Sequence, residues 1–152
     1  MIPYSRQEID KKDIESVKKV LKSRFITQGN QINIFEKKIC SKVGSRYSVA
    51  VNSATSALHI ACLALGLKKK QYLWTVSNTF VASANCGLYC GAQIDFIDID
   101  KDTFNISIEN LTKKLKSAKK KKKTPKIVVA VDFGGNPYDH KKLYELSRKY
   151  NF

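Results

Sequence analysis

Two stretches near the amino terminus carry apolar residues at the three- and four-residue spacing of an amphipathic helix. In the first these are Ile14, Val17, Val20 and Leu21, and in the second Ile34, Phe35, Ile39 and Val43. Asp10 precedes the first stretch and Asp13 follows three residues later, which is the spacing of a capped first turn. Gly44 stands where a glycine cap ends a helix. The pattern predicts one helix starting at Asp10 and another ending at Gly44.

From residue 47 onward, short apolar runs alternate with helical patterns. The predicted strands are 47–51, 72–76, 93–99 and 126–131, and the predicted helices are 54–65, 80–90, one capped by Ser107, and one from about Asp139 to Tyr150. Such alternation is typical of a mainly parallel sheet covered by helices on both faces, so we expect a doubly wound, three-layer α/β fold. The alternation calls for a further strand after the last helix, so we expect a truncated sheet.

Composition narrows the class of protein. The 152 residues contain 43% apolar residues, enough for a core, and show neither an uninterrupted apolar run of membrane-spanning length nor the apolar region of a secretory signal. We therefore expect a cytoplasmic protein without a membrane partner. The four cysteines lie in apolar segments without the ligand spacing of a zinc site, which favours buried reduced thiols and no bound metal.

The formal net charge of +15 raises the possibility of a nucleic-acid partner. The excess is nearly all lysine, however, and it is concentrated in "GLKKKQ" and "KLKSAKKKKKTPK". No basic stripe is interleaved with aromatic residues, and no nucleic-acid-binding module is recognisable. The charge pattern favours solvated lysine-rich loops over a specific nucleic-acid site.

The turn Asn52-Ser53-Ala54-Thr55, between a predicted strand and a predicted helix, is built of small residues. Free N–H groups at a helix start suit a phosphate, Ser53 and Thr55 add hydroxyl groups, and Ala54 allows close approach. The same residues make a good helix cap. No dinucleotide-binding or Walker-type glycine motif is present. From the turn alone, a phosphate site and a simple cap both remain open.

Two further turns help to distinguish a phosphate site from a simple helix cap. Phe80 falls at the start of the next predicted helix, on the same sheet edge, where its ring can lie against a planar ligand or belong to the core. The third turn, "VDFGGNP", has two glycines and a proline, and Asp132 there is either a polar wall of the same cleft or a capping group.

The chain resembles the DegT/DnrJ/StrS sugar aminotransferases, which are pyridoxal-phosphate enzymes of the aspartate aminotransferase-like fold. The similarity spans essentially all 152 residues and rests on "VAVNSATSALHIACLALGL", "NTFVASANCGLYCGAQIDFIDID" and "VDFGGNPYD", with support from the stretch beginning "MIPYSRQ". It implies that residues 1–152 are the N-terminal part of the pyridoxal-phosphate-binding large domain, without the rest of that domain and the C-terminal small domain.

The resemblance also assigns residues. Ser53, Ala54 and Thr55 match the positions that hold the phosphate of pyridoxal 5'-phosphate, and Phe80 matches the aromatic residue stacked on its ring. The positions that contact the nucleotide sugar are matched by Tyr4, Arg24, Phe25, Ile26, Thr27 and Ala54. The Schiff-base lysine and the aspartate beside the pyridine nitrogen are expected beyond Phe152, so no catalytic residue is assigned within the chain.

Two loops depart from the family pattern near the expected cofactor. Val76-Ser77 stands where relatives often have a proline, and the third turn reads Asp132 with "FGGNP" where relatives commonly have a histidine with "FAGQP" or "YAGAP". The departures bear on how the cofactor fits and leave the family resemblance intact.

The function implied is transfer of an amino group, from glutamate, to C4 of a UDP-linked 4-keto-6-deoxy-N-acetylhexosamine, in the biosynthesis of nonulosonic (pseudaminic) acid and surface glycans, by a homodimer. This chain by itself is expected to be inactive. Two alternatives stay open. A family member with histidine in place of the Schiff-base lysine dehydrates the sugar, and a non-enzymatic α/β domain binds a nucleotide or nucleic acid.

Overall fold

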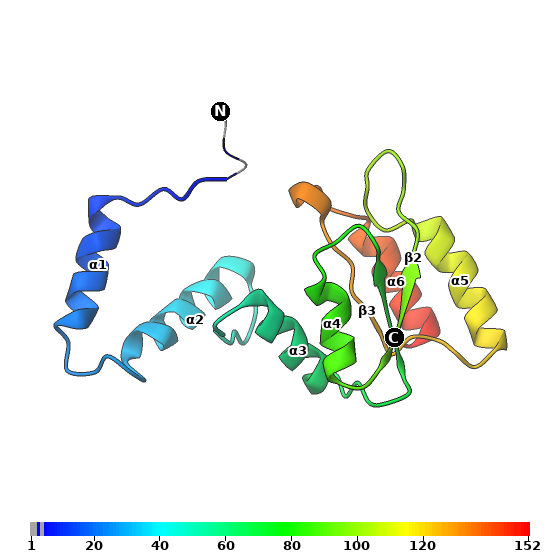
Figure 1. Ribbon diagram of the computed structural model, residues 1–152, viewed down its shortest axis with the longest axis horizontal. Coiled ribbons are helices and arrows are strands. Elements are labelled where there is room, and N and C mark those ends of the chain that lie inside the picture. Colours follow the sequence, from blue (N-terminus) through cyan, green and yellow to red (C-terminus); the bar gives the residue numbers. More distant parts are fainter. Residues whose placement is uncertain (1–2, 4) are drawn as a thin grey trace. The chain divides into compact units, whose positions relative to one another are not determined.

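The computed structural model describes residue 3 and residues 5–152, which divide into two compact units. One unit extends to Ala50 and the other runs from Val51 to Phe152 (Figure 1). No helix in the described part of the chain has the length and apolar character needed to cross a membrane.

The first unit contains α1 (Lys11–Leu21) and α2 (Asn30–Val43). The predicted cap of α1 is confirmed: the Asp10 carboxylate accepts from the Asp13 N–H at 3.0 Å, and the Asp13 carboxylate accepts from the Asp10 N–H at 2.9 Å. Gly44 ends α2 with a left-handed φ of 68°, as predicted. No residue described in this unit is buried.

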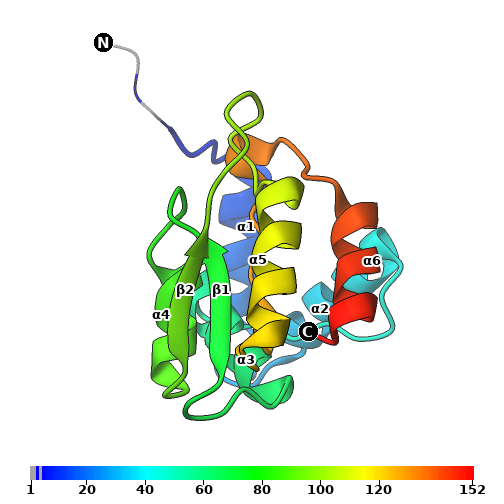
Figure 2. The ribbon, with the colours of Figure 1, turned by 90° about the vertical axis from the view of Figure 1, so that its right-hand side faces the viewer.

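The second unit is a parallel three-stranded sheet with helices on both faces. Its elements are α3 (Ala54–Ala64), β1 (Tyr72–Val76), α4 (Ala82–Tyr89), β2 (Gln93–Ile97), α5 (Ile108–Lys120), β3 (Ile127–Val128), a 3₁₀ turn (Phe133–Gly135) and α6 (His140–Tyr150). The strand order is β2-β1-β3, with Trp74 opposite Asp95 on one side and Val128 on the other. Helices flank the sheet in Figure 2. The predicted α/β class with a parallel sheet is confirmed.

Alternation along β1 directs side chains into a core on each face of the sheet. Trp74 and Val76 pack with Ile97, with α5 through Leu111 and Leu115, and with partly buried residues of α6. Leu73 and Ile127 point the other way and pack with Cys62 of α3 and Cys86 of α4. All four cysteines are free thiols. The two cores hold the ends of the strands, and the loops that follow them, in fixed positions.

The predicted strand 47–51 is wrong. These residues form no strand in the structure, and Tyr47 and Val49 are each 74% exposed. The Ala50 N–H donates to the Glu36 carboxylate at 2.8 Å, rather than to a neighbouring strand. An apolar β-branched run indicates extended backbone, but a strand needs a hydrogen-bonded neighbour, and no described strand lies in register with this segment.

The other predicted elements need only shifted boundaries. The strand predicted for 93–99 ends at Ile97, and Ile99 forms an isolated antiparallel bridge with Ile106. The strand predicted for 126–131 is reduced to Ile127–Val128, although the Val129 N–H still donates to the Trp74 carbonyl at 2.8 Å. The helix predicted for 80–90 begins at Ala82, so Phe80 lies before the helix rather than in it.

Candidate functional site

The start of α3 combines a side-chain cap with free backbone donors. Ser53 is the N-cap residue, and its hydroxyl accepts from the Ser56 N–H at 3.2 Å. The Ser53 carbonyl accepts from the Ala57 N–H at 3.0 Å. Among the hydrogen bonds of the described residues, none uses the N–H of Ala54 or Thr55. The turn is therefore a cap, as one interpretation of the sequence had it, and it still leaves two donors at the positive end of the helix dipole.

A small hydroxyl network fixes the turn, and sequence reasoning missed one member of it. The Ser56 hydroxyl donates to the Asn52 side-chain oxygen at 2.8 Å and lies 3.0 Å from the Ser53 hydroxyl. The Ser53 hydroxyl is thus engaged within the turn. No hydrogen bond in the described part of the chain uses the hydroxyl of Thr55, which is half-buried. The spacing of Asn52 to Ser56, one helical turn, was the available signal for Ser56.

Phe80 presents an unusually exposed ring. It is 74% exposed, and it follows the turn that leaves β1. The carbonyl of Phe80 accepts from the Ser83 N–H at 3.0 Å, and the Thr79 and Ser83 hydroxyls lie 2.9 Å apart. These bonds hold the backbone on either side of the ring. Since α3 and α4 pack on each other through Cys62 and Cys86, the Ser53–Thr55 turn and Phe80 precede two helices of one packed layer.

Asp132 closes the loop that follows β3. Its carboxylate accepts from the Tyr138 N–H at 3.0 Å and lies 3.3 Å from Nε2 of His140. The Tyr138 and His140 rings stack with their centroids 3.9 Å apart. Burial, and secondarily the charge of Asp132, raises the pKa of Tyr138. These contacts engage the Asp132 carboxylate within its own loop, and it makes no side-chain cap hydrogen bond to the 3₁₀ turn that it precedes.

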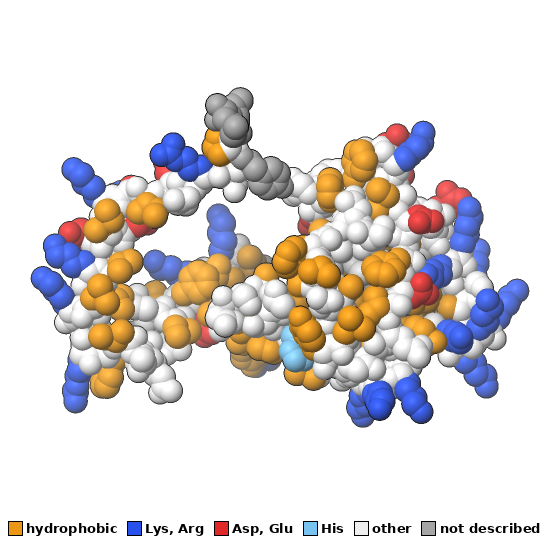
Figure 3. Space-filling view, viewed as in Figure 1, with side chains coloured by type: hydrophobic (Ala, Val, Ile, Leu, Met, Phe, Trp, Pro, Cys, Tyr) orange, Lys and Arg blue, Asp and Glu red, His pale blue; other side chains and the backbone are white. Residues whose placement is uncertain are grey.

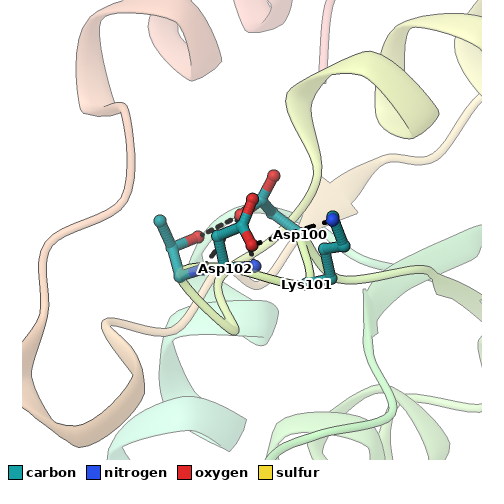
Figure 4. A network of polar contacts seen from close by, with 4 residues as sticks. Asp100, Lys101 and Asp102 are labelled. Carbon is teal, nitrogen blue, oxygen red and sulfur yellow. Dashed lines mark hydrogen bonds and ion pairs between the residues drawn. The ribbon is translucent and has the colours of Figure 1, made fainter.

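The loop after β2 is closed in a similar way (Figure 4). One carboxylate oxygen of Asp100 accepts from the Thr103 N–H at 2.9 Å, from the Thr103 hydroxyl at 3.0 Å and from the Asp102 N–H at 3.1 Å. These bonds, the Thr103 N–H first, lower the pKa of Asp100. All the acceptor contacts point within the loop, so the aspartate shapes the chain at this sheet edge.

The residues expected to contact the nucleotide sugar fall in the first unit. Arg24, Phe25 and Ile26 help to line a cavity of about 300 Å³ between the end of α1 and the start of α2. The guanidinium carbon of Arg24 lies 5.2 Å from the centroid of the Phe25 ring. Thr27 is exposed and is not part of that lining. Tyr4 lies outside the described residues.

The lysines at the end of the second lysine-rich stretch lie on the surface as predicted, but the first part of that stretch lies in α5 rather than in a loop, and Lys114 is half-buried with its Nζ 2.7 Å from the Asp95 carboxylate. Lys119 to Lys123 form the last turn of α5 and the turn that follows it, and all five are exposed. Lysines at a helix C-terminus complement the negative end of its dipole. Figure 3 shows basic side chains outnumbering acidic ones on the face in view. The exposure of the run and its place at the end of a helix agree with a solvated lysine-rich segment.

Comparison with known proteins identifies close relatives. The model of the DegT/DnrJ/EryC1/StrS aminotransferase family matches residues 7–152. A UDP-4-amino-4,6-dideoxy-N-acetyl-beta-L-altrosamine transaminase of Campylobacter jejuni is 40% identical over 153 residues, which cover 99% of this chain and 39% of the relative. The chain thus spans about two fifths of the length of that relative.

Solved structures give the same picture. Helicobacter pylori PseC, an aminotransferase involved in the biosynthesis of pseudoaminic acid, superimposes with a TM-score of 0.86 at 29% identity, over 99% of this chain and 39% of that one. The putative sugar aminotransferase Spr1654 of Streptococcus pneumoniae, in its PMP form, superimposes with a TM-score of 0.86 at 25% identity, over 98% of this chain and 37% of that one.

Proposed function

Because the chain belongs to the DegT/DnrJ/EryC1/StrS aminotransferase family, we propose that it is the N-terminal part of a pyridoxal-phosphate-dependent nucleotide-sugar aminotransferase. The observation that carries the proposal is the 40% identity to a UDP-sugar transaminase over 99% of the chain. The chain supplies the first part of the large domain, and the remainder of a longer protein supplies the rest.

The start of α3 is the proposed seat of the cofactor phosphate. Ala54 and Thr55 each offer an N–H that no described residue accepts, and the half-buried Thr55 hydroxyl stands beside them. The helix dipole adds favourable charge for an anion. Ser53, whose hydroxyl caps the helix, holds these donors in place. The residues present therefore fit a phosphate ester.

Phe80 is the proposed stacking face for the pyridine ring. The Phe80 ring is 74% exposed, and contact between this apolar surface and water is unfavourable. A planar ring stacked on Phe80 removes part of that surface from water, which favours binding. Bound pyridoxal phosphate supplies the electron sink and carries the amino group between the two substrates. The chain's own residues bind and orient it. The lysine that holds it covalently and the aspartate beside its ring nitrogen are proposed for the remainder of the longer protein.

The proposed reaction moves an amino group from glutamate to C4 of a UDP-linked 4-keto-6-deoxy-N-acetylhexosamine. Tyr4, Arg24, Phe25, Ile26, Thr27 and Ala54 are the proposed contacts for the nucleotide sugar. Arg24 suits a diphosphate because its guanidinium donates to two oxygens at once. We further propose a homodimer that works in the cytoplasm, in pseudaminic acid biosynthesis. The Helicobacter relative, described as an aminotransferase involved in the biosynthesis of pseudoaminic acid, supports this pathway.

Cofactor binding is tested on the chain itself by titrating it with pyridoxamine phosphate and following ¹⁵N-labelled amide shifts. We expect the Ala54 and Thr55 amides to shift most, and Thr55→Val to weaken binding about tenfold because one hydrogen bond to a charged group is lost. Thr112→Val on α5, whose hydroxyl bonds to the Ile108 carbonyl, is the matched control. Binding that is equal in Thr55→Val and the wild type contradicts the phosphate seat.

The reaction is tested on the full-length protein with ¹⁵N-glutamate and the UDP-linked ketosugar. The expected product carries ¹⁵N on C4, detected by mass spectrometry and NMR. A product that has lost water at the sugar, with no nitrogen incorporated, assigns the protein to the dehydratase branch instead. Binding of DNA with sequence preference, and no turnover of either kind, supports the non-enzymatic alternative.

A further inference from the structure

Three loops follow β1, β2 and β3 at one edge of the parallel sheet, the edge at which such sheets bind ligands. Asn105 lies in the loop between β2 and α5 and is only 3% exposed. Its main-chain carbonyl accepts from the Asp100 N–H at 2.8 Å, so it belongs to the closed loop that Asp100 organises. The polar atoms of a buried carboxamide need hydrogen-bond partners, because they have lost contact with water.

Both polar atoms of the Asn105 side chain bond to the loop that follows β3. Nδ2 donates to the Asn136 carbonyl at 2.9 Å, and Oδ1 accepts from the Phe133 N–H at 2.9 Å. Asn136 and Phe133 are 31 and 28 positions from Asn105 in the sequence. The two hydrogen bonds therefore attach Asn105 to both ends of the 3₁₀ turn. That turn includes Gly134 and Gly135, with positive φ of 60° and 81°, and so has little rigidity of its own.

Phe104, the residue before Asn105, is hydrogen-bonded to the loop that follows β1. The Phe104 carbonyl accepts from Nδ2 of Asn78 at 3.2 Å, and Asn78 stands two residues before Phe80. The Phe104 ring lies 5.9 Å from the Phe133 ring. Phe104 has a φ of +58°, a conformation costly for a bulky residue, which the surrounding contacts maintain. All three loops are therefore linked through residues 104 and 105.

The side-chain chemistry at position 105 is specific. A carboxamide combines an NH2 donor group and an oxygen acceptor at the length needed to reach both backbone groups. Aspartate keeps the acceptor for the Phe133 N–H but sets an oxygen against the Asn136 carbonyl. Alanine leaves both backbone groups without this partner, and unpaired buried polar groups are destabilising.

We infer that Asn105 is a positioning residue of the proposed cofactor site: its carboxamide fixes the 133–136 turn, and Phe104 beside it holds the loop that leads to Phe80. The inference rests on the proposed function, because that site is assigned through Ser53–Thr55 and Phe80. Asn105 itself touches neither the phosphate turn nor Phe80 in any described hydrogen bond. Its effect on the cofactor is exerted through the two loops.

The experiment measures two quantities on the ¹⁵N-labelled chain: the hydrogen-exchange rate of the Phe133 amide and the affinity for pyridoxamine phosphate. In Asn105→Ala we expect exchange of that amide to be about tenfold faster and the Kd for pyridoxamine phosphate to rise at least about fivefold. Asn110→Ala on α5, whose side chain makes no described hydrogen bond, should leave both values within about twofold of wild type.

Asn105→Asp is the second variant. If Asn105→Ala does not fold, Asn105→Asp tests whether the carboxamide affects the affinity for pyridoxamine phosphate. It keeps the acceptor for the Phe133 N–H, so exchange of that amide stays slow while the affinity for pyridoxamine phosphate falls. Unchanged Phe133 exchange in Asn105→Ala, or unchanged affinity in both variants, overturns the inference. A wild-type chain that does not bind pyridoxamine phosphate contradicts the proposed phosphate seat at Ser53–Thr55 instead, and the exchange measurement still decides whether Asn105 fixes the turn.

Discussion

The two units of the chain use the same kinds of helix but differ in what the helices rest on. In the unit from Val51 onward, Leu111 and Leu115 of α5 are fully buried against the sheet. In the unit up to Ala50, the corresponding apolar faces stay open, with Ile14 58%, Val17 60% and Leu21 62% exposed. α1 therefore holds its shape by local signals, chiefly its capping box. The difference shows that caps and periodicity define a helix, whereas burial requires a partner surface.

The largest expected effect comes from deleting a buried leucine. Leu111→Ala should lower the free energy of unfolding of the second unit by about 2 to 5 kcal/mol, through lost burial and a cavity. Ile14→Ala, an equally apolar truncation on exposed α1, should cost within about 0.5 kcal/mol. Urea unfolding followed by the fluorescence of Trp74, the single tryptophan, measures the first, and circular dichroism measures the second. Equal losses in the two variants would remove the distinction between the units.

Two glycine-to-alanine substitutions are expected to destabilise the two units for different reasons. Gly87→Ala crowds the packing of the second unit, and Gly44→Ala strains the backbone of the first. In Gly87→Ala the new Cβ lies 2.6 Å from Cδ1 of Ile94 and 3.1 Å from Cβ of Leu73, so we expect a loss of about 1 to 3 kcal/mol. Gly44→Ala meets no atom within 4 Å, but its φ of +68° strains the backbone by about 1 to 2 kcal/mol.

A rescue experiment separates the two causes. Ile94→Val removes the Cδ1 atom that the Gly87→Ala methyl meets, so the double variant should recover part of the loss in urea unfolding. The cost of Gly44→Ala should be unaffected by Ile94→Val. Additive losses from Gly87→Ala and Ile94→Val would show that crowding is not the cause.

A pH effect is expected in the buried unit. Burial, and secondarily Cys86, raises the pKa of the Cys62 thiol from 9.0 to about 12. The thiol therefore ionises more readily in the unfolded chain, and its stabilising contribution is complete below about pH 9 and is lost as pH rises towards 12. Between about pH 8 and 10 this amounts to about 1 kcal/mol.

Urea unfolding of the second unit at several pH values measures this effect. Cys62→Ala should lower the starting stability but flatten the alkaline decline. Cys40→Ala, on α2 of the other unit, is the control and should leave the decline unchanged. A decline of the same slope in Cys62→Ala and wild type would show that other groups cause it.

The smallest effect concerns helix caps. Asp10→Ala removes the acceptor for two N–H groups of α1 and should destabilise that helix by about 0.5 to 1 kcal/mol, visible as lost helical character in amide and Cα chemical shifts. Ser107→Ala removes the equivalent cap of α5. Because α5 is packed on the sheet, its helical shifts should remain, while the unfolding free energy falls slightly. Full retention of α1 in Asp10→Ala would show that its cap is not what maintains it.

Local patterns predicted much of the fold. The capping residues Asp10, Ser53 and Ser107 are where the sequence places them, and β1 has its predicted limits. These features depend on a few neighbouring residues, since a cap needs only a side-chain acceptor and the next turn of backbone. The predicted strand 47–51 failed for the opposite reason: pairing depends on a distant neighbour.

In the candidate site, too, residues in local motifs were identified from the sequence and a residue with long-range contacts was not. The Ser53–Thr55 turn and Phe80 were identified from the sequence through motif and resemblance, and their role in binding the cofactor stays a prediction. Asn105 was not identified, because its importance lies in bonds to residues 28 and 31 positions away. A single asparagine before "ISIEN" gives no periodic or motif signal.

The sequence alone determined the helices, most of their caps, three of the four predicted strands and the family, because each depends on short-range geometry or on a recognisable string of residues. Only the tertiary structure decided which apolar faces are buried, which predicted strand pairs, and how the three loops at the sheet edge are joined. Those outcomes depend on hydrogen bonds and packing between segments far apart in the chain, which no local pattern specifies.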